Sequence, residues 1–170
     1  MCYQSMKALV IGRFQPFHNG HLHLLQNLCT QYDQVVIGIG SSQYSYTMDN
    51  PFSFEERVRM IQESLTEVMK KKIIIYSIPD IHDLSRWVDH VVNIVGGFDV
   101  VISNNQLTIK LFSKKGYPVC STPLYHKEKY AGTQIRRQIL HNSSWKKLVP
   151  TPVARIIEEI QGVNRIQHLV

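Results

Sequence analysis

Short apolar runs recur along the chain and predict the strands of a sheet. The first, Lys7 to Gly12, ends in a glycine, and the second, Gln34 to Ile39, continues into a polar loop. Each run is largely apolar throughout instead of alternating with polar residues, which is typical of a parallel strand covered on both faces. The predicted strands are residues 7–12, 34–39, 72–78, 99–103 and 117–121.

Segments with apolar residues at a helical spacing lie between these runs and predict the helices. Ser53 and Glu56 form an S-x-x-E capping box ahead of a helical pattern that continues through Val68. Thr133 is expected to cap a later helix and Thr151 the last one. The predicted helices are residues 20–31, 54–68, 84–95, 107–115, 134–140 and 152–160.

Strands that alternate with helices predict an α/β domain, a doubly wound five-stranded parallel sheet with helices on both faces. Such sheets bind ligands beyond the carboxyl ends of their strands, where the strand order reverses. The segments expected there are the loop after Gly12, the Gly40 loop, the Asp80 loop and the Ser103-Asn104 turn.

No repeat or linker divides the sequence, so residues 1–170 are interpreted as a single domain. Residues 1–6 are interpreted as an N-terminal extension, with Met6 as an alternative start, and residues 151–170 as a C-terminal helical segment. No apolar run approaches the roughly 20 residues that span a bilayer, and none forms a signal-peptide core. A cytoplasmic protein with no membrane partner is expected.

Charge and cysteine content narrow the classes of partner. The formal charge of +6 suits an anion, but the basic residues stand in short, separate groups, which favours a small phosphate-rich substrate over a nucleic-acid groove. Cys2, Cys29 and Cys120 lack a C-x-x-C pairing and are expected to be free thiols.

The stretch from Gly12 to His21 joins the first strand to the first helix and carries most of the chemistry. His18 in the loop and His21 near the first helical turn are both able to aim a ring nitrogen at one anion, together with the free N–H groups of the helix. Gly20 lets that anion approach the backbone, and Arg13 adds a positive charge. The stretch is interpreted as a nucleotide phosphate site.

Two other interpretations of the histidines stay open. They are ordinary surface residues, or His18, His21 and His23 form a metal site, although no cysteine or acidic residue nearby completes a ligand set.

The sequence Gly132-Thr133-Gln134-Ile135-Arg136-Arg137 is a second helix start suited to an anion. Thr133 is able to offer a hydroxyl to phosphate, and Arg136, one turn further, is able to reach the same anion as a planar fork. Arg137 points elsewhere. A plain capped amphipathic helix is the alternative.

Polar residues after the other strands complete the candidate site. Gly40 permits a close approach of ligand to the backbone, with Ser41 and Ser42 as donors. Trp87 either packs in the core or stacks on a planar ring, and Asn104 is a turn former or an amide that contacts ligand.

The motifs G-R-F-Q-P-F-H-x-G-H and G-T-x-I-R-R together resemble the H-x-G-H nucleotidyltransferase superfamily, and within it the archaeal type of nicotinamide mononucleotide adenylyltransferase. The resemblance extends from Lys7 to about Leu169. Further segments that carry it are residues 37–43, 50–52, 56–57, 78–81, 87–88 and 145–150.

The resemblance implies a Rossmann-like fold and a reaction that joins ATP to nicotinamide mononucleotide, giving NAD and pyrophosphate. By position it implies catalytic roles for Arg13, His18, His21 and Arg136. It implies ATP and NAD contacts for Gly12, Phe14, Gly20, Gly40, Ser41, Ser42, Gly132, Thr133 and Ile135. It implies nicotinamide mononucleotide contacts for Gln43, Asp80, Trp87 and Asn104. Relatives commonly read S-G-N-P where this chain has residues 103–106, which leaves the role of Asn104 open.

The attacking group of that reaction is a phosphate oxygen already anionic at neutral pH, so no general base is required. No carboxylate in the motifs is placed for a metal, and Mg²⁺ is expected to arrive on the ATP phosphates. A homo-oligomer, a hexamer in the family, is expected, with exposed apolar surface on Val163 to Val170 as an interface. The alternatives are an adenylyltransferase for phosphopantetheine, a flavin nucleotide or another small phosphorylated acceptor, and a nucleotide sensor without turnover.

Overall fold

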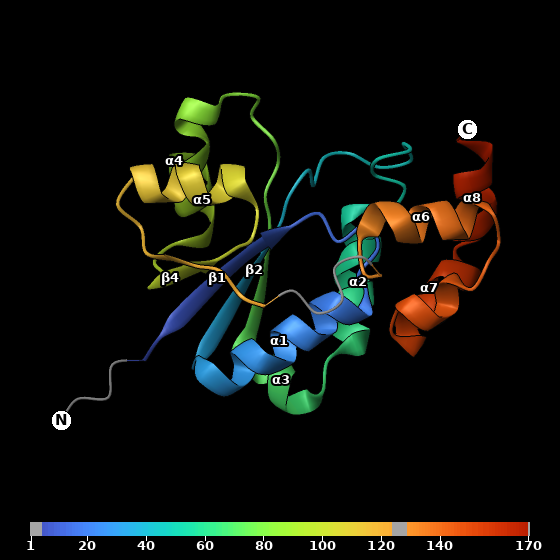
Figure 1. Cartoon of the computed structure of the whole chain (residues 1–170), viewed down its shortest axis with the longest axis horizontal. Helices are drawn as coiled ribbons and strands as arrows, with labels where there is room; N and C mark the ends of the chain where they lie inside the picture. The colour runs from blue at the N-terminus through green and yellow to red at the C-terminus, as the bar shows by residue number, and fades with distance from the viewer. Residues whose placement is uncertain (1–4, 124–128, 170) are drawn as a thin grey trace.

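The computed structural model describes residues 5–123 and 129–169 and contains a five-stranded parallel sheet (Figure 1). Its strand order is β3-β2-β1-β4-β5, so the order reverses between β1 and β4. The strands are β1 (Lys7–Gly12), β2 (Gln34–Ile39), β3 (Ile73–Ser77), β4 (Val100–Ile102) and β5 (Val119–Cys120). The predicted Rossmann-like sheet is confirmed, and its switch point lies beside the predicted phosphate loop.

Helices cover both faces of the sheet (Figure 1). The helices are α1 (Asn19–Gln31), α2 (Phe54–Ser64), α3 (Glu67–Lys72), α4 (Leu84–Val95), α5 (Gln106–Lys114), α6 (Gly132–Leu140), α7 (Thr151–Glu159) and α8 (Gly162–His168), with a 3₁₀ turn η1 (Trp145–Leu148). Ala8 and Val10 pack under α1, α2 and the C-terminal helices, whereas Leu9 packs under α4 and α5. Successive β1 side chains thus enter opposite cores, which explains the unbroken apolar run.

The predicted helix through Val68 is wrong, because two helices occupy that stretch. Leu65 ends α2, and the Thr66 side chain accepts a hydrogen bond from the Met69 N–H to start α3. Val68 lies on α3 with 69% of its surface exposed. A cap-forming Thr66 inside an apparently continuous pattern was the signal for the break.

Both predicted threonine caps are also wrong. Ala131 is the N-cap of α6 and Pro150 that of α7, neither with a side-chain cap bond, so Thr133 and Thr151 lie within the helices. Beyond the predicted last helix, Gly162 begins a further helix, α8, after the left-handed residue Gln161 (φ 54°).

The C-terminal helix packs against the domain instead of presenting an apolar face. Ile166 is buried at 2% exposure, and Val163 packs against the main core. Arg165 forms a two-point ion pair with Glu56 at the start of α2, with N–O distances of 2.6 and 2.9 Å. The expected exposed apolar surface on this segment is therefore wrong for its described residues.

The chain ends and cysteines add smaller observations. The Met6 N–H donates to Asp33 at 2.9 Å, while residues 1–4, including Cys2, lie outside the described residues. Cys29 is buried and Cys120 exposed, and both are free. In the described part of the chain, no helix is long and apolar enough to cross a membrane.

Candidate active site

Two histidines close the amino end of α1 by accepting each other's backbone N–H groups. Nδ1 of His18, the N-cap residue, accepts the His21 N–H at 3.2 Å, and Nδ1 of His21 accepts the His18 N–H at 3.3 Å. Their rings stack with centroids 3.4 Å apart and planes inclined by 17°. The pair is a capping box in which imidazoles take the places of the usual serine and glutamate.

Burial keeps both histidines neutral. Desolvation lowers the pKa of His18 to about 4. Desolvation is also the main cause that lowers the pKa of His21 well below its usual value, and the charge interaction with His18 adds to it. A neutral imidazole carries one proton, and because each Nδ1 accepts a hydrogen bond, that proton sits on Nε2. The pair therefore offers Nε2–H dipoles instead of full positive charges.

Aromatic residues and a glycine hold the two rings in place. Phe14 contacts His21 edge-on at 4.8 Å between centroids, and Phe17 stacks on the same ring at 5.6 Å. A Cβ on Gly20 would lie 3.1 Å from His18 Nδ1 and 3.0 Å from Tyr130 Cβ. Gly20 thus leaves room for the His18 ring, a nearer reason than the predicted approach of an anion.

Three cavities follow the carboxyl edge of the sheet and share lining residues. One of about 410 Å³ lies beside His18, His21 and Asn104. A smaller one of about 220 Å³ lies at the ends of β1 and β4; it shares His21 and Asn104 with the first and is also lined by Gly12 and Phe14. A third, of about 400 Å³, is lined by Arg13, Asp80, Trp87 and Asn105, among others. Most predicted site residues therefore come together at the predicted edge.

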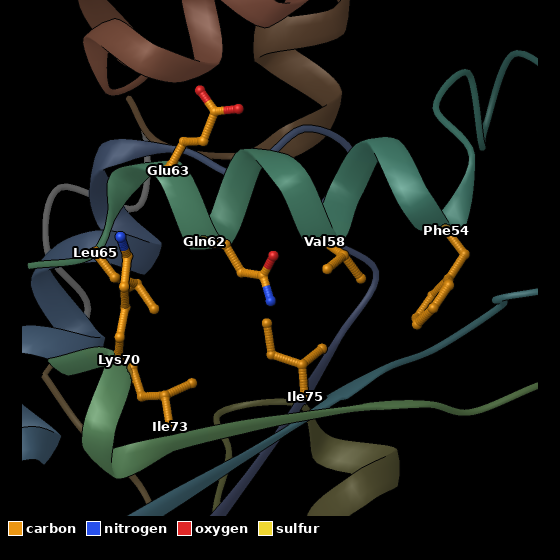
Figure 2. A pocket seen from close by; sticks show the side chains of 8 residues that line it. All are labelled: Phe54, Val58, Gln62, Glu63, Leu65, Lys70, Ile73 and Ile75. Atoms are coloured by element: carbon orange, nitrogen blue, oxygen red, sulfur yellow. The ribbon is translucent and has the colours of Figure 1, made fainter. Parts of the chain in front are cut away.

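A larger cavity of about 610 Å³ lies elsewhere, between α2, α3 and the edge strand β3 (Figure 2). Val58 and Gln62 point from α2 toward Ile75, while Glu63 points away toward the C-terminal helices. Glu63 is bonded to arginines of α2 and α7, and Lys70 is paired with Glu67. The charged side chains that line this cavity are therefore held in ion pairs. None of the residues that line the cavity is a predicted site residue.

Arg136 reaches from α6 to the phosphate loop. Its Nη1 donates to the Gln15 carbonyl at 2.9 Å, and Asp49 Oδ1 lies 3.7 Å from its Nη2. Burial and then the charge of Arg13 lower the pKa of Arg136. A Cβ on Gly132 would lie 3.2 Å from the same carbonyl, so this glycine allows α6 to approach the loop.

The other predicted residues of α6 differ in accessibility. Thr133 is exposed and keeps its hydroxyl available. Ile135 is fully buried in the core, and its N–H donates to the Ala131 carbonyl. Helical periodicity therefore turns the Ile135 side chain inward from Thr133, and the ATP or NAD contact of Ile135 stays a prediction for its backbone.

The loops after β2 and β3 are joined by side chains predicted to contact ligand. Ser41 Oγ donates to Asp80 Oδ2 at 2.7 Å. The Gln43 amide bonds both backbone groups of Asp80, each at 2.9 Å. The Ser42 N–H donates to the Ile78 carbonyl at 3.3 Å. Much of this polar set thus holds one loop against the other.

Gly40 and Trp87, two further predicted site residues, both leave room for a ligand. A Cβ on Gly40 would meet only the Gly12 carbonyl, 3.9 Å away, so packing does not require a glycine there. Trp87 packs edge-on against Phe112 at 5.7 Å, and its remaining surface lines the third cavity. The core and ligand-facing interpretations of Trp87 are thus compatible.

Asn104 is engaged by the backbone after β5. Its amide nitrogen donates to the Thr122 carbonyl at 2.9 Å, and its oxygen accepts the Thr122 N–H at 3.3 Å. Asn105 is the N-cap of α5 and accepts the Thr108 N–H at 3.0 Å. Asn104 therefore joins two loops while also lining the cavity beside the histidines.

Comparison with known proteins decides the family. Residues 9–138 match a family model described as cytidylyltransferase-like. A nicotinamide-nucleotide adenylyltransferase of Methanococcus aeolicus is 45% identical, over 96% of this chain and 95% of its own length. The enzyme of that name from Archaeoglobus fulgidus is 42% identical, over 96% of this chain and 97% of its own. The chain belongs to the nicotinamide-nucleotide adenylyltransferase family.

This adenylyltransferase also shares its fold with a solved structure. A bifunctional NMN adenylyltransferase/ADP ribose pyrophosphatase from Francisella tularensis superposes with a TM-score of 0.77 over 98% of this chain, at 22% identity. The chain spans 52% of that longer protein, so the likeness concerns the fold. Full-length relatives with one name favour an adenylyltransferase of NAD biosynthesis over the sensor and the other acceptors.

Sequence reasoning missed two buried polar residues beneath the adenylyltransferase site. The Gln15 amide pairs with both backbone groups of Phe52, at 2.9 and 3.0 Å. Arg57 is fully buried on α2 and bonds backbone carbonyls of the site loops. The available signal for Arg57 was a charged residue on the same helical face as Met60 and Ile61.

Proposed function

We propose that the cavities along β1 and β4 bind ATP and nicotinamide mononucleotide, and that the adenylyl group passes directly between them to give NAD and pyrophosphate. The observation that carries this proposal is the histidine pair, because two Nε2–H donors stand together at the amino end of α1. That place in the fold favours the binding of a polyphosphate. Family membership supports the overall reaction.

The reaction we propose is an in-line displacement. A phosphate oxygen of nicotinamide mononucleotide attacks the α-phosphorus of ATP, and the bond from this phosphorus to the β-phosphate bridging oxygen breaks. The electron pair leaves with pyrophosphate, and no proton has to be removed from the nucleophile. His18 and His21 donate to the phosphate oxygens, while Arg13 and Arg136 offset the charge that grows on the leaving group.

The acceptor nucleotide is proposed to enter the cavity lined by Trp87. This cavity of about 400 Å³ lies beside Arg13 and offers an indole surface to a planar nicotinamide ring. Asp80 lines the same cavity, and Gln43 holds the Asp80 backbone. Asn104, on the neighbouring loop, is proposed to face the shared region between the two nucleotides.

Mg²⁺ is proposed to enter with ATP, bound by phosphate oxygens and water. Within residues 5–123 and 129–169, no three His, Cys, Asp or Glu side chains gather as a metal site. The site instead presents N–H and guanidinium donors, which fit the oxygens of a nucleotide that brings its own cation. When bound, the ion offsets phosphate charge. A homo-oligomer, with six copies as in the family, remains our expectation for the assembly.

Two measurements test this function. Incubation with ATP, Mg²⁺ and nicotinamide mononucleotide is expected to yield NAD and pyrophosphate in equal amounts, and absence of both products contradicts the proposal. Direct transfer also predicts that labelled pyrophosphate does not exchange into ATP until nicotinamide mononucleotide or NAD is added. Exchange with ATP alone would indicate a covalent adenylyl-enzyme.

A further inference from the structure

Arg57 is a buried cation that bonds main-chain carbonyls in place of a carboxylate. Its side chain is fully buried on α2, and none of the ion pairs among the described residues includes it. Its guanidinium donates to the carbonyls of Ser53 at 3.1 Å, Arg13 at 3.0 Å, Gly40 at 3.0 Å and Ser41 at 3.3 Å. One side chain therefore joins the loop after β1, the loop after β2 and the start of α2.

One nitrogen of Arg57 bridges the two site loops. Nη1 donates to both the Arg13 and Gly40 carbonyls. The residue after each carbonyl, Phe14 (φ 52°) and Ser41 (φ 48°), has a left-handed backbone that side chains rarely adopt. Such a conformation is strained and persists only where surrounding contacts hold it. Arg57 supplies such a contact at both positions.

The direction of these peptides has a consequence for the site. In a trans peptide the C=O and the following N–H point in opposite directions. Since the Arg13 and Gly40 carbonyls point at Arg57, the N–H groups of Phe14 and Ser41 point away from it. Neither N–H has an acceptor among the described residues. The Gly40 N–H donates to the Gly12 carbonyl at 2.9 Å, which keeps the two strand ends together.

We infer that Arg57 is a positioning residue of the adenylyltransferase, which turns the N–H groups of Phe14 and Ser41 toward the substrate phosphates. The inference rests on the proposed function, because it takes the phosphates to lie at this edge of the sheet. Arg57 itself touches no substrate. It acts through the two peptide groups that it holds.

The chemistry of arginine suits this role. Burial lowers the pKa of Arg57 to about 10, with Glu55 opposing the shift, so the guanidinium stays charged at neutral pH. Its planar fork provides five N–H donors in fixed directions, enough for four carbonyls. A lysine has the charge but only three donors on one nitrogen, so it is unable to hold both loops in the same geometry.

Arg57→Lys separates this role from simple stability. The control is Met60→Ala, one turn further on the buried face of α2. It is expected to lower stability through the lost core packing and to leave the two loops in place. At a temperature where both variants are folded, Arg57→Lys is expected to lose roughly 10- to 100-fold in kcat/KM for ATP, as expected for misplaced binding groups. Met60→Ala is expected to keep the wild-type value. Equal kcat/KM in the two variants would overturn the inference.

The amide resonances of Phe14 and Ser41 give a readout that does not depend on activity. In the wild-type protein, inorganic tripolyphosphate is expected to shift both ¹H–¹⁵N peaks, and in Arg57→Lys the shifts are expected to shrink. Equal shifts in wild type and Arg57→Lys overturn the role of Arg57 and leave the phosphate placement standing. Absence of any shift in the wild type shows that the phosphates lie elsewhere and overturns this inference directly, even where Arg57→Lys does not fold.

Discussion

The Nδ1 atoms of His18 and His21 each accept the other's backbone N–H, at 3.2 and 3.3 Å, so the same two rings cap a helix and face a cavity. Capping by Nδ1 fixes Nε2 as the ring nitrogen that carries the proton, and both rings line the cavity. Structure and chemistry therefore depend on the same pair of hydrogen bonds.

The two roles can be separated by replacing the imidazoles with an ordinary capping box. His18→Ser/His21→Gln is expected to retain most of the stability of the wild type, because serine and glutamine form the same reciprocal bonds. His21→Ala removes one half of the box and is expected to cost about 1 kcal/mol in the free energy of unfolding. Urea denaturation of the three proteins measures the difference. A double variant no more stable than His21→Ala would contradict the capping role.

Stability is expected to rise with pH across the range set by His18. The folded protein keeps His18 neutral down to a pKa of about 4, while the unfolded chain binds a proton near pH 6.5. The unfolded state therefore binds more protons between these values, and stability is lost as pH falls from about 6.5 to about 4. His18 alone contributes a loss on the order of 2–3 kcal/mol.

The same double variant is the control for this pH effect. Denaturation midpoints measured from pH 4 to pH 7 are expected to vary less in His18→Ser/His21→Gln than in the wild type, because the other titrating groups are shared. Parallel pH profiles for the two proteins would show that the histidines are not held neutral by burial.

Gly20 is expected to be sensitive to a single added methyl group. In Gly20→Ala the new Cβ would lie 3.1 Å from His18 Nδ1, so the ring has to shift by a few tenths of an ångström. A shift of this size is expected to lower kcat/KM by about tenfold. Gly97→Ala is the control, since a Cβ there meets nothing within 4 Å. Wild-type kinetics for Gly20→Ala would show that the ring position is not critical.

The ion pair between Arg165 and Glu56 is expected to contribute more to stability than the exposed pairs on the surface. Both side chains are largely buried, at 19% and 16% exposure, and they meet at two points. Arg165→Ala is expected to cost about 2 kcal/mol, because it leaves the Glu56 carboxylate without its partner. Arg155→Ala, whose side chain is 60% exposed, is expected to cost less than about 1 kcal/mol. Equal losses in thermal or urea denaturation would contradict this ranking.

The sequence was sufficient to locate the strands because both faces of the sheet are buried. Val35 and Val36 enter opposite cores, and a run that is apolar on both faces has few other structures to adopt. Helix boundaries were less predictable. The helical spacing of apolar residues continued across Thr66 although the chain turns there. This spacing does not distinguish one long helix from two consecutive helices that bury the same side.

The sequence was sufficient to locate the site, but not to predict the hydrogen bonds within it. His18 and His21 stood out because they follow a strand that ends at the switch point. Their reciprocal caps, like the four carbonyls around Arg57, depend on backbone directions that no residue pattern encodes. The Arg57 bonds to Arg13 and Gly40 also join segments far apart in the sequence.

The central claim is that the neutral histidine pair acts mainly on the transition state of adenylyl transfer. It is tested most directly by kcat at saturating ATP, Mg²⁺ and nicotinamide mononucleotide, set beside the calorimetric Kd of each nucleotide, for His18→Ser/His21→Gln. We predict that kcat falls by about 100-fold or more, as for the loss of preorganised N–H donors, while both Kd values change far less. A wild-type kcat in this variant, or a loss confined to the Kd values, would contradict the account.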